Sequence, residues 1–157
     1  MLPRTYDNQN CSIARTLELV GERWTMLVLR EAFLGRRRFE EYAERLGIAR
    51  NVLSARLARL VDEGVLEKVR YQDRPERFEY RLTAKGRDLW PVLSALRDYG
   101  DRHYAPDGPP VLVPHRGCGG ELDDRRICRR CGAALELADV EAHPGPGALS
   151  AAAPARG

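Results

Sequence analysis

The sequence lacks long apolar runs, is poor in histidine and contains almost no lysine. It has no stretch of about 18 consecutive apolar residues, so no membrane-spanning helix is expected. The first ten residues, MLPRTYDNQN, have no apolar core behind a basic start and do not resemble a signal peptide, which favours a cytoplasmic protein. Three histidines, no glycine-rich phosphate loop and no recognisable pair of carboxylates leave little support for an enzyme.

The basic residues are mostly arginine, since only Lys68 and Lys85 of the 26 are lysine. The net charge of +3 over 157 residues is modest but unevenly distributed. Residues 1–104 contain 20 basic and 16 acidic residues, whereas residues 105–157 contain 6 and 7. The basic excess therefore lies in the longer N-terminal part. This distribution is compatible with nucleic-acid binding but does not establish it.

Residues 46–69 have the pattern of a turn, a helix and a strand. An apolar stripe at helical spacing consists of Leu53, Leu57, Leu60 and Val61. The opposite face is small, polar or basic, and comprises Arg50, Asn51, Ser54, Ala55, Ala58 and Arg59. Gly64 favours the end of the helix, and residues 65–69 alternate as in a strand. This order is typical of the recognition helix and wing of a winged helix-turn-helix. An ordinary surface helix before a hairpin has the same pattern.

Further elements of that arrangement flank this stretch. Helices are expected from Cys11 or Ser12 to about Val20, over residues 23–33 and over residues 39–46. The last follows three arginines, Arg36, Arg37 and Arg38. A hairpin pairs residues 66–71 with residues 78–82, and its polar tip contains Arg74 and Arg77. Arginines at these two places can reach phosphates, although basic turns and hairpin tips are usually only solvated.

A long helix is expected from a cap at Thr83 to about Tyr104. Pro91 lies inside it and lacks a backbone donor, which predicts a kink near residues 87–91. Its apolar stripe consists of Leu89, Leu93, Leu96, Tyr99 and His103. A terminal helix of this kind is typical of a dimerisation helix. It can also fold back onto its own domain, and the two arrangements are compatible.

The three C-terminal cysteines and one histidine have the spacing of metal ligands. His115, Cys118, Cys128 and Cys131 follow the pattern H-x2-C-x9-C-x2-C, with a glycine after each pair. Four such ligands suit a closed, tetrahedral structural zinc site. A segment this short has no core of its own, so the metal would supply much of its folding free energy. A metal-free thiol cluster or a Cys128–Cys131 redox pair remains an alternative.

Taken together, the motifs over residues 11–104 resemble the HxlR family of bacterial regulators, which are MarR-like winged-helix proteins. The resemblance rests on Cys11 and on five segments in register. These are LELVGERWTMLVLREAFLG (17–35), RRRFEEY (36–42), LGIARNVLSARLARLVDEGVLEK (46–68), PERFEYRLTAKG (75–86) and PVLSAL (91–96). The sequence departs from the family at Ala49, where a serine is expected at the head of the recognition helix. This change removes a helix cap worth about 1 kcal/mol.

The resemblance implies a homodimeric transcriptional regulator, with repression the expected mode, that binds a pseudo-palindromic operator. Half-sites would lie about 34–36 Å apart, with one recognition helix in each major groove. The expected DNA-binding residues are Arg37, Arg38, Arg50, Asn51, Ser54, Arg59, Arg74 and Arg77. Arg50 is the best candidate for a bidentate guanine contact. A small molecule or a thiol-reactive compound could act as effector, the latter through Cys11, although a cysteine there can equally be a small buried residue.

The expected fold is mainly α with a small β-wing (α+β), a winged helix-turn-helix dimer with a zinc-ribbon-like extension. The expected segments are a flexible arm (1–10), the DNA-binding and dimerisation domain (11–104), a linker (105–114), the metal unit (115–142) and a disordered tail (143–157). The competing interpretation is a protein-interaction adaptor, built on a degenerate winged helix with a zinc docking module. The arginine-rich wing favours DNA.

Overall fold

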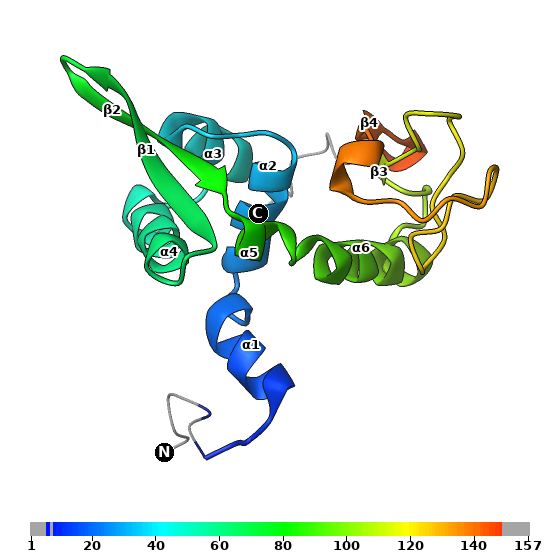
Figure 1. Ribbon diagram of the computed structural model, residues 1–157, viewed down its shortest axis with the longest axis horizontal. Helices are drawn as coiled ribbons and strands as arrows, with labels where there is room; N and C mark the ends of the chain where they lie inside the picture. The colour runs from blue at the N-terminus through cyan, green and yellow to red at the C-terminus, as the bar shows by residue number, and fades with distance from the viewer. Residues whose placement is uncertain (1–5, 7, 149–157) are drawn as a thin grey trace, which may run out of the picture. The chain divides into compact units, whose positions relative to one another are not determined.

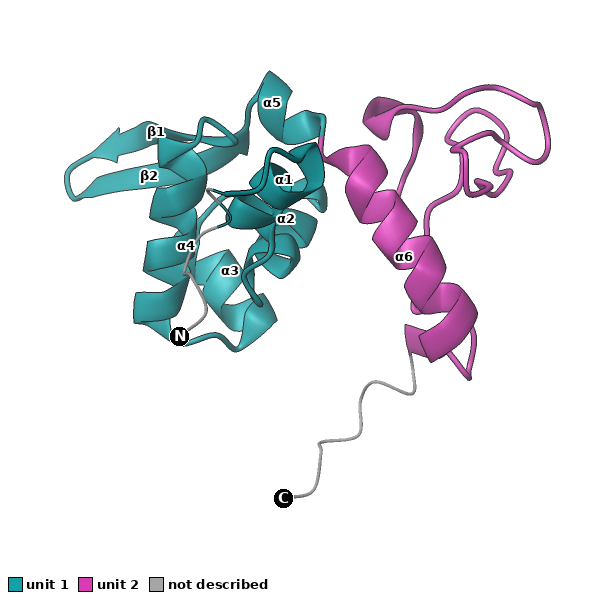
Figure 2. Ribbon diagram, turned by 90° about the horizontal axis from the view of Figure 1, so that it is seen from below, with its two compact units in different colours: residues 1–88 teal, residues 89–157 magenta. Residues whose placement is uncertain are grey.

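The computed structural model describes residue 6 and residues 8–148, and the chain divides into two compact units. Unit 1 comprises residues 1–88 and unit 2 residues 89–157 (Figure 2). The expected arm at residues 1–10 lies partly outside the described residues, as does the end of the expected tail, residues 149–157. Within the described chain, no helix is long and apolar enough to cross a membrane.

The helical part of unit 1 agrees with the expected ranges to within two residues. It consists of α1 (Ser12–Val20), α2 (Thr25–Phe33), α3 (Phe39–Leu46) and α4 (Arg50–Asp62) (Figure 1). The core is formed by side chains with no exposed surface, namely Val28, Leu29, Tyr42, Leu53, Leu57 and Leu60. Burying each aliphatic side chain contributes roughly 1.5–3 kcal/mol. The hydroxyl of Tyr42 donates to the carbonyl of Arg36 at 2.8 Å, which satisfies the polar atom of the ring.

The turn between α3 and α4 depends on a glycine and lacks a side-chain cap. Gly47 adopts the left-handed conformation, with φ 58°, and its amide donates to the carbonyl of Ala43. Ile48 is buried and anchors the turn to the core. Ala49 occupies the N-cap position of α4 and offers no side-chain hydrogen bond. The backbone amides in the first turn of α4 therefore receive no hydrogen bond acceptor from the side chain of the N-cap residue.

The wing is a two-stranded antiparallel hairpin, longer than expected by two residues on each strand. Strand β1 (Leu66–Asp73) pairs with β2 (Glu76–Leu82) from Leu66 opposite Leu82 to Asp73 opposite Glu76. The register shifts between Arg70 and Gln72. The Tyr80 amide of β2 donates to the Arg37 carbonyl at 2.7 Å, so the segment before α3 is joined to the wing.

The predicted long helix is two helices rather than one kinked helix. Helix α5 (Ala84–Arg87) ends unit 1, and α6 (Trp90–Tyr104) begins unit 2. Thr83 caps α5 as expected, because its hydroxyl accepts a hydrogen bond from the Gly86 amide at 3.0 Å. Pro91 lies in the first turn of α6, where its missing amide leaves no hydrogen bond unmade. The proline therefore starts a new helix instead of bending a continuous one.

Unit 2 combines α6 with a mostly irregular C-terminal segment. Short strands β3 (Val111–Leu112) and β4 (His143–Pro144) pair antiparallel, and a 3-10 helix spans Leu137–Asp139. The structure thus places paired strands within the segments expected as a linker (105–114) and a disordered tail (143–157). The small core of unit 2 contains Trp90, Cys128, Leu135 and Val140.

We predict opposite stability effects for two glycine-to-alanine substitutions. A Cβ on Gly86 would lie 2.2 Å from the Val65 carbonyl oxygen, whereas a Cβ on Gly100 of α6 would meet nothing within 4 Å. G86A should lower the free energy of unfolding by about 1–3 kcal/mol through overpacking. G100A should raise it by about 0.5–1 kcal/mol through helix propensity. Chemical denaturation measures both, and a G86A variant as stable as the parent would contradict the described contact.

Candidate nucleic-acid interface and metal centre

The outer face of α4 is exposed along its whole length. The exposed residues include Arg50, Asn51, Ser54, Ala55, Ala58 and Arg59, opposite the buried leucines. Val61, which we expected to complete the apolar stripe, is only half-buried. Ala55 and Ala58 have short side chains, so they project less from the helix than the polar side chains around them. The surface can therefore approach another molecule closely.

Arg50 is held by an acidic residue of the preceding helix. Its Nη1 and Nη2 lie 2.7 and 2.6 Å from the two carboxylate oxygens of Glu40, and its guanidinium lies 4.8 Å from the centre of the Phe39 ring. This hydrogen bond lowers the pKa of Glu40, so the carboxylate stays ionised near neutral pH. Arg59 forms an i,i+4 ion pair with Glu63 at 2.9 Å. Neither contact was foreseen from the sequence.

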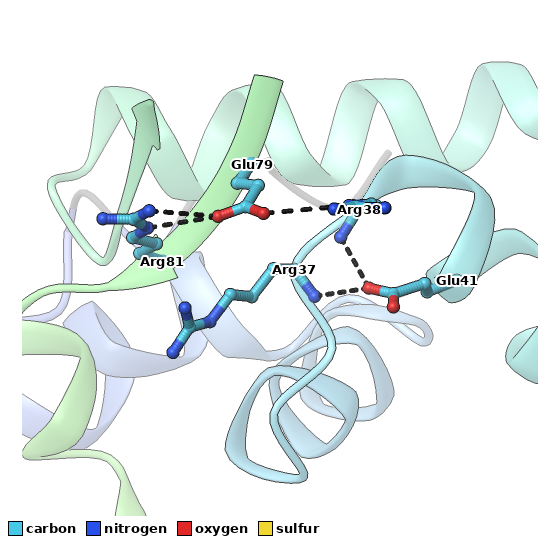
Figure 3. A network of polar contacts seen from close by, with 5 residues as sticks. All are labelled: Arg37, Arg38, Glu41, Glu79 and Arg81. Atoms are coloured by element: carbon cyan, nitrogen blue, oxygen red, sulfur yellow. Dashed lines mark hydrogen bonds and ion pairs between the residues drawn. The ribbon is translucent and has the colours of Figure 1, made fainter. Parts of the chain in front are cut away.

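The arginines before α3 have different roles (Figure 3). The backbone amides of Arg37 and Arg38 both donate to the Glu41 carboxylate at 2.9 Å, which lowers the pKa of Glu41. The guanidinium of Arg38 lies 3.7 Å from Glu79 of β2 and stacks 4.7 Å from the Tyr71 ring. In the figure the Arg37 side chain points away from these partners, and it forms no ion pair among the described residues. Arg37 is thus free to bind a ligand, whereas Arg38 holds the wing.

The wing presents two arginines near its tip. Arg74 and Arg77 are exposed, and neither guanidinium has an acidic partner within the described part of the chain. Arg70, which the sequence reasoning did not single out, pairs instead with Asp73 and Glu76 at 3.3 and 2.8 Å. Figure 1 shows the hairpin extending beyond the helices of unit 1. The two unpaired arginines therefore lie on a projecting element.

The four expected metal ligands converge in unit 2. The Nδ1 of His115 lies 3.3 Å from the Cys118 sulfur and 3.4 Å from the Cys131 sulfur, and the Cys118 and Cys128 sulfurs are 3.4 Å apart. All four ligand atoms lie within 4.8 Å of one another. Tetrahedral zinc, with Zn–S of about 2.3 Å and Zn–N of about 2.0–2.1 Å, requires ligand separations of about 3.5–3.8 Å. The observed cluster is close to that geometry and could bind a metal.

Two similar turns bring the ligands together. The Gly119 and Gly132 amides donate to the carbonyls of His115 and Cys128 at 2.7 and 2.9 Å, and both glycines have positive φ, 72° and 73°. These turns are the knuckles that the spacing predicts. Gly120 is also required for close packing, since a Cβ there would lie 2.5 Å from the Cys128 sulfur.

Backbone amides also stabilise the thiolate of Cys128. The Cys131 amide has the largest effect and the Arg130 amide adds to it, so that the pKa of Cys128 falls to about 6. A thiolate is the form that binds a metal ion. The local backbone therefore favours the thiolate of Cys128. At Cys118 the Gly120 amide acts in the same direction, but burial and the neighbouring sulfurs outweigh it and raise the pKa of that thiol.

Cys11 lies at the start of α1 and is exposed rather than buried. It occupies the N-cap position, but its side chain makes no capping hydrogen bond. Within a single chain, Cys11 therefore does not fill the core. Its role as a sensor of thiol-reactive compounds stays a prediction.

Comparison with known proteins assigns the chain to a family. Residues 19–107 match the profile of the HxlR-like helix-turn-helix family. The chain belongs to this family. The uncharacterized HTH-type transcriptional regulator Rv3095 of Mycobacterium tuberculosis (strain ATCC 25618 / H37Rv) is 50% identical to this HxlR-like chain over 137 residues, 87% of each protein.

Two solved structures are similar to this HxlR-like chain over most of its length. The crystal structure of PA1607, described as a candidate transcription factor, has 37% identity and a TM-score of 0.70, and covers 87% of this chain and 96% of its own. PA1374 from Pseudomonas aeruginosa, described in the same way, has 42% identity and a TM-score of 0.52, with coverages of 94% and 95%.

The comparisons confirm the family suggested by the motifs. Members of this HxlR-like family are DNA-binding transcription regulators and not enzymes. The fold has the expected winged-helix character, with helices and a small antiparallel sheet. A match of 137 residues in a chain of 157 must include residues 21–137, so the likeness to Rv3095 extends over the segment that contains the Cys/His cluster.

Proposed function

We propose that the protein is a sequence-specific transcriptional repressor that binds a pseudo-palindromic operator as a homodimer. The observation that carries this proposal is the exposed polar face of α4 opposite its fully buried leucines. A helix with such a face can enter the major groove, where each base pair displays a distinct pattern of hydrogen-bonding groups. The exposed arginines of the wing add positive charge beside this helix.

The arginines of the proposed interface fall into three groups. In this proposal Asn51 and Ser54, with Arg50 in the first turn of α4, contact base edges. Arg37, Arg74 and Arg77 lack acidic partners among the described residues and would contact phosphates. Arg38 and Arg59 engage Glu79 and Glu63, so their proposed contacts with DNA are secondary. The alternative, a protein-interaction adaptor, requires no free arginines at the wing tip.

We predict that R74A and N51A weaken DNA binding in different ways. R74A should weaken binding to all sequences alike and reduce the slope of log K against log salt by about 0.9, because one phosphate contact is lost. N51A should cost about 1–3 kcal/mol on a selected site and leave that slope unchanged. Selection of sites from a random duplex pool, followed by salt titrations, measures both. A parent protein without sequence preference would contradict the proposed function and favour the adaptor.

The homodimer is supported by an unpartnered apolar face on α6. Val92, Leu96 and Tyr99 are 40, 53 and 57% exposed and recur at i, i+4 and i+7. Helix α1 likewise exposes Ile13 and Leu17, by 71 and 42%. Large apolar side chains gathered on one helix face are typical of an interface. A two-fold dimer would bury such a face against its own copy.

We predict that L96E dissociates the dimer and that A58E does not. Ala58 is exposed on α4 and lies outside the apolar faces of α1 and α6, so the two variants add the same charge on different surfaces. Burial of an unpaired carboxylate costs several kcal/mol, which corresponds to a dimer dissociation constant at least about 100-fold higher. Sedimentation velocity over a range of concentrations measures this change. Equal masses for L96E and the parent would exclude α6 from the interface.

We also propose that the Cys/His cluster binds one structural zinc ion. The four ligands leave no open position for water, which is typical of a structural rather than a catalytic site. The core of unit 2 is small, so the metal would contribute folding free energy that apolar burial does not supply. A metal-free thiol cluster or a Cys128–Cys131 redox pair would not require a histidine beside the cysteines. The Nδ1 of His115 lies next to the Cys118 and Cys131 sulfurs, which favours a four-ligand metal site.

We predict about one zinc per chain in reduced protein and its loss in C131S but not in C11S. Cys11 lies outside the cluster, so C11S removes a thiol without removing a ligand. Protons compete with zinc for the three thiolates and the imidazole, so lowering the pH should release the metal. Metal analysis and acid titration with a zinc-sensitive dye measure both. Equal zinc contents in C131S and C11S would contradict the ligand set.

A further inference from the structure

Glu40 forms an ion pair with Arg50 that is expected to contribute little to the stability of the fold. Its carboxylate accepts two hydrogen bonds from the Arg50 guanidinium, at 2.6 and 2.7 Å, and joins α3 to the first turn of α4. Both side chains are 65% exposed, so the pair lies on the surface and outside the core. Exposed ion pairs contribute little to stability and are screened by salt. A role in what Arg50 binds is the better explanation.

The geometry leaves Arg50 able to bind a base while it is paired. A guanidinium carries five N–H donors, and the contact with Glu40 uses one from each of Nη1 and Nη2. The Nε–H and the outer hydrogens remain available. A guanine edge needs two donors, which these groups can supply. The ring of Phe39, 4.8 Å from the guanidinium carbon, further restricts its position.

We propose that Glu40 is a positioning residue that sets the DNA specificity of Arg50. This inference rests on the proposed function. The carboxylate holds the guanidinium in one orientation, so fewer side-chain conformations are lost when a base is bound. The same negative charge repels phosphates and reduces the attraction that an unpaired arginine has for any DNA. Both effects raise the ratio of specific to non-specific affinity, which is the quantity that selects an operator.

The test compares E40Q with E44Q. Glu44 lies one turn further along α3, is exposed and has no side-chain partner among the described residues, so E44Q makes the same change of charge without disturbing Arg50. Affinities are measured for a duplex selected by the parent protein and for a scrambled duplex of the same composition. E40Q should lower the ratio of the two affinities by about 2–10-fold, and E44Q should leave it unchanged. Thermal unfolding should be the same for both variants.

A second comparison tests whether Glu40 acts through Arg50. In an R50A background, E40Q should no longer change the affinity ratio. An unchanged ratio in E40Q, equal effects of E40Q and E44Q, or an effect that persists in R50A would each overturn the inference. These outcomes leave the proposed function intact, because the parent protein would still prefer its selected duplex. A parent protein with no preference would overturn the proposed function itself.

Discussion

The packing of α4 against the rest of unit 1 is the interaction on which the other features depend. Leu53, Leu57 and Leu60 have no exposed surface, and they lie on one side of the helix. Because successive helical residues are rotated by about 100°, burying this side fixes which residues face outwards. Asn51 and Ser54 are exposed for that reason and not through contacts of their own. The candidate binding surface is therefore oriented by residues that do not belong to it.

The wing is connected to this helical core by contacts that the local sequence does not reveal. The Tyr80 amide bonds to the Arg37 carbonyl, and the Arg38 guanidinium reaches both Glu79 and Tyr71. A two-stranded hairpin alone is marginally stable, so such contacts are needed to hold its direction. One arginine of a basic run is thus used within the protein, while its neighbour Arg37 remains available. Residue type alone could not distinguish the two.

The features that the sequence predicts are those set by short-range rules. Helical periodicity located α3 and α4, and the knuckle spacing located the cluster of His115 with three cysteines, because each pair of ligands is joined by a tight local turn. The predicted kink near residues 87–91 was wrong, because the chain ends one helix there and begins another. Pro91 is compatible with either arrangement, so the sequence did not distinguish them. The pairing of Glu40 with Arg50 was missed because it depends on how two helices meet.

The distribution of ion pairs explains how an arginine-rich chain can avoid indiscriminate binding to DNA. Arg50, Arg56, Arg59, Arg70 and Arg81 each lie between 2.6 and 3.1 Å from a carboxylate. Each such pair reduces the positive field that attracts any phosphate backbone. Arg37 and the two wing-tip arginines, Arg74 and Arg77, are among the described basic residues that keep no acidic partner. Under the proposed function, the paired arginines contribute less non-specific attraction than these unpaired ones, so the balance between the two groups affects how strongly binding depends on the sequence of the DNA.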